Sequence, residues 1–251
     1  MNSNFMESFV GKAEPYQDLW QLAKQYSIID TDNTNMNYSK KTFAPDVNKT
    51  WMTNKDIDKF CSWSNPSSVG ITKSHLNLSN HLRMLWEQHI IWTVFTIVSL
   101  IEDRPYKDLV VSRLLRNPVD FEIALRPLYG NEKAAKFSNL LTTHLVIASD
   151  LVKAAKAGDN KAVADAEKKW YANADEIAAF LGSINPYWSR ESWRQMLYKH
   201  LELTKSEAVY WLTKEYQKAI NIYDEIEKQA LDMADMMTEG IVNQFPNMFI
   251  K

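Results

Sequence analysis

From His75 onward, apolar residues recur three or four positions apart, which is the spacing of one face of an α-helix. Long stretches contain no glycine or proline, and no run alternates apolar and polar residues as a half-buried strand would. Gly130, Gly158, Gly182 and Gly240 fall where a helical pattern ends or weakens, as C-terminal caps do. The pattern predicts an all-α protein.

The same pattern predicts four long helices. They run from about His75 to Glu102, Asn131 to Ala157, Asp159 to Leu181, and Thr213 to Gln244. Pro118 and Pro127 are expected to interrupt the segment between the first two. A shorter helix is expected from Ser189 to Leu203, after which Thr204-Lys205-Ser206-Glu207 has the form of a capping box that starts another. Because most links are short, we expect an antiparallel four-helix bundle, and no internal repeat is evident.

Residues 1–74 have a different character from the rest of the chain. They are rich in Asn, Ser, Thr and Asp, with one predicted helix from Pro15 to Tyr26. We therefore expect an irregular N-terminal extension, 1–74, packed on a helical bundle domain, 75–251.

Charge and cysteine content exclude several classes of protein. The formal net charge is −2, and Lys and Arg are spread along the chain, so no basic surface for nucleic acid is indicated. Cys61 is the single cysteine, which excludes an internal disulfide and a thiolate metal cluster. The first twenty residues do not form a signal peptide. We expect a cytoplasmic protein, with export after removal of a signal peptide as the alternative.

The stretch Leu82 to Leu100 is the most apolar in the chain. Its uncharged part, Gln88 to Ile101, has 14 residues, fewer than the roughly 20 that a bilayer requires. This stretch therefore predicts a buried core helix and no membrane span.

Three polar residues interrupt the apolar stripes at one predicted depth. His89 lies 13 residues before Glu102, and His144 lies 13 residues after Asn131. Both should therefore lie roughly 20 Å from that end of the hairpin, at about 1.5 Å per residue. Counting from the next turn places Asn173 at the same level. The carboxylates expected near this level are Glu176, Asp224 and Glu227.

Buried polar groups must be hydrogen-bonded or coordinated, so this layer predicts either a closed network or a bound ligand. Two imidazoles facing carboxylates are a plausible site for a divalent metal, Zn, Fe or Mn. A carboxylate-bridged di-iron centre is not expected, because no Glu lies three residues before a histidine. The alternatives are a small organic ligand and a non-enzymatic network that only fixes helix register. In a third, weaker interpretation, His89 or His144 acts as a general base.

Four further side chains are secondary candidates. His200 lies on one face with Trp193 and is more typical of a packing histidine than of a ligand. Trp86, Trp92 and Trp170 would be core residues in most bundles, but they could also line an aromatic pocket.

Several segments resemble a known family. They are LRMLWEQHIIWT, RLLRNPVDF, LVKAAKAGD, KWYANADEIAAFLGSINPYW, MLYKHLELTKSEAV and MADMMTEGI. They are similar to helical proteins of spore-forming Gram-positive bacteria that often carry the label acetylglutamate kinase. That family has no established reaction, so the resemblance implies no catalytic residue. A phosphate-binding loop requires closely spaced glycines, and no two of the six glycines lie within ten residues of each other. No kinase activity is therefore expected.

Overall fold

The computed structural model describes residues 70–250, which fold into five α-helices and one short 3-10 helix. They are α3 (Lys73–Ile101), α4 (Lys107–Ala157), α5 (Asn160–Ile184), α6 (Arg190–Leu212), α7 (Tyr216–Gln244) and η3 (Pro246–Met248). No strand occurs in this range. The all-α prediction is therefore confirmed. The predicted extension, and with it the helix from Pro15 to Tyr26, lies outside the described residues.

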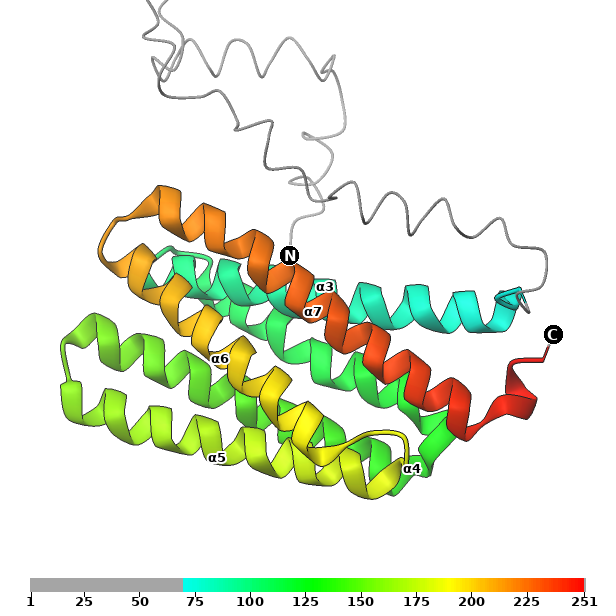
Figure 1. The fold of residues 1–251 in the computed structure, drawn as a ribbon. Helices are drawn as coiled ribbons and strands as arrows, with labels where there is room; N and C mark the ends of the chain where they lie inside the picture. The colour runs from blue at the N-terminus through cyan, green and yellow to red at the C-terminus, as the bar shows by residue number, and fades with distance from the viewer. Residues whose placement is uncertain (1–69, 251) are drawn as a thin grey trace, which may run out of the picture. The chain divides into compact units, whose positions relative to one another are not determined.

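Helix α4 has two halves that run in opposite directions (Figure 1). The bend is at Gly130, whose φ of 78° and ψ of 169° are not helical and are open to glycine. Pro118 and Pro127 lie inside the first half without ending it, so the predicted interruption was wrong. Pro118 is buried beside Phe121, and packing of this kind offsets the hydrogen bond that a proline removes.

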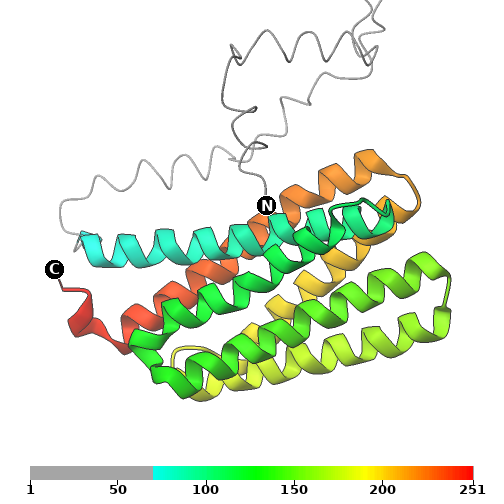
Figure 2. The same ribbon diagram turned by 180° about the vertical axis from the view of Figure 1, so that it is seen from behind.

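The helices form three antiparallel hairpins (Figures 1 and 2). The first pairs α3 with the first half of α4, the second pairs the other half of α4 with α5, and the third pairs α6 with α7. Helix α7 packs back against α3, which closes the ring.

The expected four-helix arrangement is not confirmed. The segment that the two prolines were expected to interrupt is the first half of α4, and the helix from Ser189 continues to Leu212. Thr204 and Glu207, which were expected to form a capping box, are buried inside α6. Helix starts are capped instead by Thr72, Asp159 and Ser189, whose side chains accept from backbone N–H groups.

The hydrophobic core forms two clusters. The main cluster fills the space between all five helices. A small cluster of Ile97, Leu100, Val152 and Ala208 lies near the ends of α3, α4 and α6. Among the described helices, only α3 is long and apolar enough to cross a membrane, and 44% of its most apolar window is buried inside the bundle. This burial agrees with the core helix that the sequence predicts.

Candidate functional site

Three buried histidines lie in the core, one in each hairpin. Each Nδ1 is hydrogen-bonded to a carboxamide oxygen on the second helix of its own hairpin: His89 to Asn117 (3.1 Å), His144 to Asn173 (2.9 Å) and His200 to Gln229 (3.1 Å). Each carboxamide N–H donates back to the carbonyl four residues before the histidine: Leu85 (2.9 Å), Leu140 (3.2 Å) and Met196 (3.0 Å). We call each set of two bonds a clamp.

The clamps fix the protonation of the rings. Because each carboxamide nitrogen donates to a carbonyl, its oxygen faces the imidazole and must accept a hydrogen bond. Nδ1 therefore carries the hydrogen, and Nε2 is left with the lone pair. In the neutral ring, this is the tautomer that the clamp selects.

Burial makes this neutral state strongly preferred. It lowers the pKa of His89 to about 4 and, with the repulsion of a charged His89, the pKa of His144 to about 3. The pKa of His200 also lies well below its ordinary value, because of burial and of repulsion from the other two rings. The His89 and His200 rings are 5.7 Å apart, centroid to centroid. The three imidazoles therefore form one electrostatically coupled layer.

Some predicted members of the layer are present and others are not. His89, His144 and Asn173 are buried in it, as the depth count predicts. Asp224 and Glu176 are instead exposed, and Glu227 is half-buried. On α7, the buried stripe passes through Ile226, Ala230 and Met233. Asp224 is two residues from Ile226, roughly 200° around the helix at 3.6 residues per turn, so it points to solvent.

The secondary candidates divide in the same way. His200 belongs to the layer. Trp86 packs edge-on against His89 at 5.5 Å, and Trp170 packs against His144 at 5.3 Å. Trp92 is half-buried, and its ring lies 4.9 Å from the Arg113 guanidinium.

Sequence reasoning missed Asn117 and Gln229, although their spacing carried a signal. The histidines are 55 and 56 residues apart, and the three carboxamides are each 56 residues apart. Seven residues before each histidine stands a large buried side chain, Leu82, Phe137 or Trp193. The hairpins thus repeat a pattern of polar and apolar positions in which the histidine recurs each time, a repeat that sequence reasoning also missed.

The histidine layer does not have the form of a metal site. Within residues 70–250, no group of three or more His, Cys, Asp or Glu side chains is arranged to hold a metal ion. The carboxylates that were expected to complete the ligand set lie elsewhere. A Zn, Fe or Mn ion in this layer stays a prediction.

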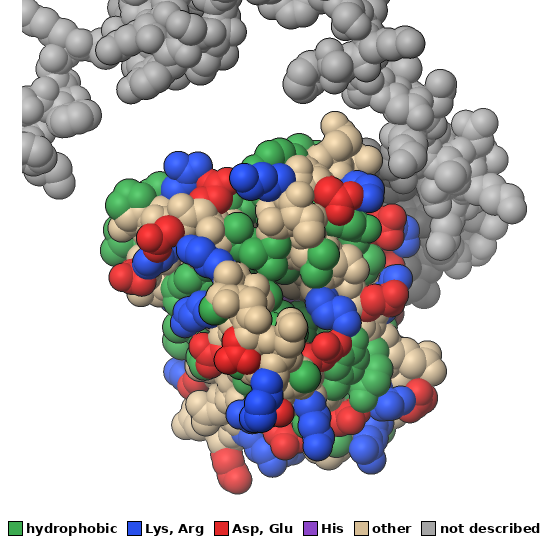
Figure 3. All heavy atoms as spheres, turned by 90° about the vertical axis from the view of Figure 1, so that its left-hand side faces the viewer, with side chains coloured by type: hydrophobic (Ala, Val, Ile, Leu, Met, Phe, Trp, Pro, Cys, Tyr) green, Lys and Arg blue, Asp and Glu red, His purple; other side chains and the backbone are tan. Residues whose placement is uncertain are grey.

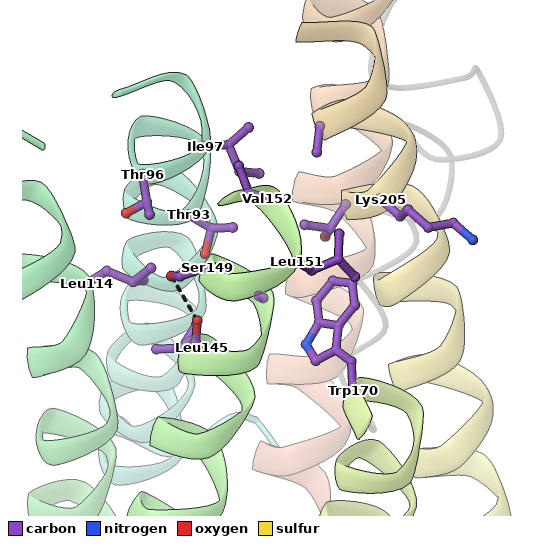
Figure 4. Close-up of a pocket in the computed structure, with 13 residues that line it drawn as sticks. Thr93, Thr96, Ile97, Leu114, Leu145, Ser149, Leu151, Val152, Trp170 and Lys205 are labelled. Carbon is purple, nitrogen blue, oxygen red and sulfur yellow. Dashed lines mark hydrogen bonds between the residues drawn. The ribbon is translucent and has the colours of Figure 1, made fainter. Parts of the chain in front are cut away.

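A pocket adjoins the layer, where the two hydrophobic clusters meet (Figure 4). It begins one turn beyond the histidines, at Thr93, Ala148 and Thr204, and is walled mainly by apolar side chains. The cavity volume that is open to the centre of a water molecule is about 20 Å³. It therefore has room for water or for a ligand of a few non-hydrogen atoms.

Three polar atoms in the pocket lining have no hydrogen-bond partner. They are Thr96 Oγ1, Thr204 Oγ1 and Trp170 Nε1, all buried. The other hydroxyls, Thr93 and Ser149, bond to carbonyls of their own helices.

The pocket wall carries no free charge. Lys205 is its one charged residue, and the Lys205 ammonium points away from the other lining residues (Figure 4) toward Glu167, at 2.6 Å. The residues that line the pocket therefore carry two unpartnered hydroxyls and one unpartnered N–H in an uncharged, mostly apolar setting.

The pocket lies near one end of the bundle. Ile97, Val152 and Ala208 belong both to its wall and to the small cluster near the ends of α3, α4 and α6. Figure 3 faces this end, where apolar side chains are visible among charged ones. A ligand entering from this end would have to pass the small cluster.

Comparisons with protein-family models, with curated proteins and with solved structures find no match to this chain. The resemblance to the bacterial helical family therefore stays a prediction.

Proposed function

We propose that the protein binds a small, uncharged organic molecule in the pocket beside the histidine layer. The observation that carries this proposal is the set of three unpartnered polar atoms, Thr96 Oγ1, Thr204 Oγ1 and Trp170 Nε1. A buried polar atom without a partner costs about 1–3 kcal/mol, so a molecule that satisfies several of them gains that energy on binding.

The chemistry of the wall selects the class of ligand. The indole N–H can only donate, so the ligand must carry an acceptor such as a carbonyl or hydroxyl oxygen. Because the only charged residue in the wall, Lys205, is already paired with Glu167, a neutral molecule is favoured, since an unpaired charge is costly in an apolar site. A ligand of five non-hydrogen atoms binds at best with about −7.5 kcal/mol, which is micromolar affinity.

Butanone and its hydrocarbon analogue 2-methylbut-1-ene test this proposal, because they differ in one carbonyl oxygen. At millimolar concentration, butanone should raise the melting temperature more than the hydrocarbon does. It should also shift one indole N–H signal in the NMR spectrum, identified with Trp170→Phe. Thr204→Val should weaken butanone binding, whereas Thr143→Val, which alters an exposed hydroxyl on α4, should not. Equal effects of the two molecules on the wild-type protein would contradict the proposal.

A second variant tests the location. Ala148→Val adds two methyl groups to the pocket wall and should abolish butanone binding in a folded protein. If butanone still raises the melting temperature of this variant without shifting the Trp170 signal, the molecule binds somewhere else.

A second candidate is a non-enzymatic role in which the histidine layer only fixes the register of the hairpins. The three clamps favour it, because each closes its own hydrogen bonds. On this hypothesis, replacing His89 and His144 together with Gln lowers stability but leaves butanone binding intact. Loss of butanone binding in the folded double variant would show that the layer also shapes the pocket.

The predicted metal ion has its own test. If a divalent ion occupies the layer, elemental analysis of untagged protein should find it in stoichiometric amount. A chelator should then lower the melting temperature, because a ligand bound only to the native state stabilises it. No metal and an unchanged melting temperature would refute the metal prediction.

A further inference from the structure

Three carboxylates without partners come together on α3, α6 and α7, away from the pocket. They are Glu87, Glu207 and Glu227. Among the described residues, none of the three makes a hydrogen bond or an ion pair with another side chain. Arg83, whose charge opposes the rise in the pKa of Glu87, is already bonded to both oxygens of Asp235, at 2.5 and 2.6 Å.

The helix registers bring these residues near one another. The clamp between His200 and Gln229 sets antiparallel α6 against α7, so Glu207, two turns beyond His200, lies opposite Tyr223. Tyr223 and Glu227 are one turn apart on the same face of α7.

Helix α3 completes the cluster. The ion pair between Arg83 and Asp235 sets antiparallel α3 against α7, so Glu87, one turn beyond Arg83, lies at the level of Leu231, one turn from Glu227. The cluster of Glu87, Glu207, Tyr223 and Glu227 therefore draws on three helices.

Glu207 is the floor of this acidic cluster. Its side chain is only 2% exposed, and its Oε1 has no partner. Leaving a carboxyl buried in this way costs free energy unless a ligand supplies the missing donor. Glu87 and Glu227 are half-buried and form the rim.

The electrostatics agree with this placement. Burial and the charges of Glu87, Glu227 and Glu207 together raise the pKa of Tyr223, so all three carboxylates act on one hydroxyl. Burial, followed by the charges of Glu87 and Asp224, raises the pKa of Glu227. Glu87 therefore repels Glu227, and of the three carboxylates only Glu87 is acted on by a base, Arg83.

The shape of the cluster argues for an organic cation. No group of three acidic side chains in residues 70–250 is arranged to hold a metal. From the level of Glu207 to that of Glu87 is about eight residues along α7, or roughly 12 Å. An extended aliphatic chain with an ammonium group near each end matches this length, and the ring of Tyr223 can face a cation.

We propose that Glu87, Glu207, Tyr223 and Glu227 form a binding site for a linear aliphatic diamine or polyamine. This site is independent of the pocket proposed above. The ammonium groups would donate to Glu87 and Glu227 at the rim and to Glu207 at the floor. A cation at the floor favours the ionised form of Glu207, so binding near pH 7 releases a proton.

Spermidine is the probe for the full-length protein, and isothermal titration is the assay. We expect saturable binding at low salt. Glu87→Gln with Glu227→Gln should weaken it at least tenfold, whereas Glu225→Gln, an exposed neighbour on α7, should leave it unchanged. Titration in two buffers of different ionisation enthalpy should show proton release in the wild type and none in Glu207→Gln.

Three results would overturn the proposal. They are no saturable binding of spermidine, equal loss of binding with Glu225→Gln, and displacement of spermidine by an equal concentration of Mg²⁺. The rim variants alter half-exposed residues, and Glu207→Gln replaces a carboxyl with a neutral group of the same shape, so all three should fold. Butanone binding in the same variants shows that the core is intact and keeps this test separate from that of the pocket.

Discussion

The stability of the protein should depend on pH through the buried carboxyl of Glu207. Burial raises its pKa from 4.5 to about 8. Between these values the folded protein keeps a proton that the unfolded chain has lost, so stability falls as the pH rises through this window. The loss is complete above the folded pKa.

The size of this effect follows from the shift. Each pH unit within the window costs about 1.4 kcal/mol for one group. From pH 5 to pH 7.5 the contribution of Glu207 to the free energy of unfolding should fall by about 3 kcal/mol, as an order of magnitude. Glu207→Gln has no such proton to lose. Its stability relative to the wild type should therefore rise by this amount over the same range.

The three histidines act in the opposite direction. Their folded pKa values are lowered, to about 4 for His89 and about 3 for His144. Below about pH 6.5 the unfolded chain binds protons that the folded protein does not, so stability is lost as the pH falls. Three histidines against one carboxyl leave a net loss of about 2.7 kcal/mol per pH unit near pH 5.5. Taken together, these four groups place the stability maximum at about pH 6.8, where the protons that the unfolded histidines bind balance the one that folded Glu207 keeps.

Urea denaturation followed by circular dichroism, at half-unit steps from pH 5 to pH 8.5, measures the free energy of unfolding on both sides of this maximum. The comparison of wild type with Glu207→Gln cancels the contribution of every other group. Parallel pH profiles for the two proteins would refute the reasoning about Glu207. A flat wild-type profile between pH 6.5 and pH 5 would refute the assignment of three neutral, buried histidines.

Two further substitutions test the packing of the core. Asn173→Ala should cost about 2–4 kcal/mol in urea denaturation, because it leaves both the ring of His144 and the carbonyl of Leu140 without their partner and opens a small cavity. Gly240→Ala should also destabilise, by about 3 kcal/mol or more, although alanine favours a helix by about 1 kcal/mol. Its added Cβ would lie 1.9 Å from Nε1 of Trp188. A melting temperature equal to or above that of the wild type would contradict either expectation.

Part of this fold was predictable from local pattern. The first helix was placed within two residues at each end, because its apolar run is long and Asp103-Arg104-Pro105 marks its end. His89, His144 and Asn173 were predicted because each interrupts an apolar stripe. The periodicity did not show that the helix continues through Pro118. Since that proline was taken to break the helix, the whole first half of α4, with Asn117, was left out of the bundle.

The carboxylates show a second limit of sequence reasoning. The depth count missed on α7, because the layer lies at Gln229, five residues or roughly 7.5 Å beyond Asp224. Height along a helix also does not fix direction around it, and Asp224 is exposed. Glu207 was interpreted as part of a capping box because it follows Thr204 by three residues. Inside a continuous helix the same spacing puts both residues into the core, where one lines the pocket and the other forms the floor of the acidic cluster.

The clamps explain why the pocket lies where it does. Each sets the register of its hairpin at the histidine, and the three helices that carry the histidines run in the same direction (Figures 1 and 2). The residues four positions later, Thr93, Ala148 and Thr204, therefore meet one turn beyond the layer, and all three line the pocket. The first and third hairpins place a threonine there, whereas the second places an alanine. The smaller side chain of Ala148 leaves space beside the hydroxyl of Thr204, and this asymmetry in an otherwise repeated arrangement accounts for a cavity in the core.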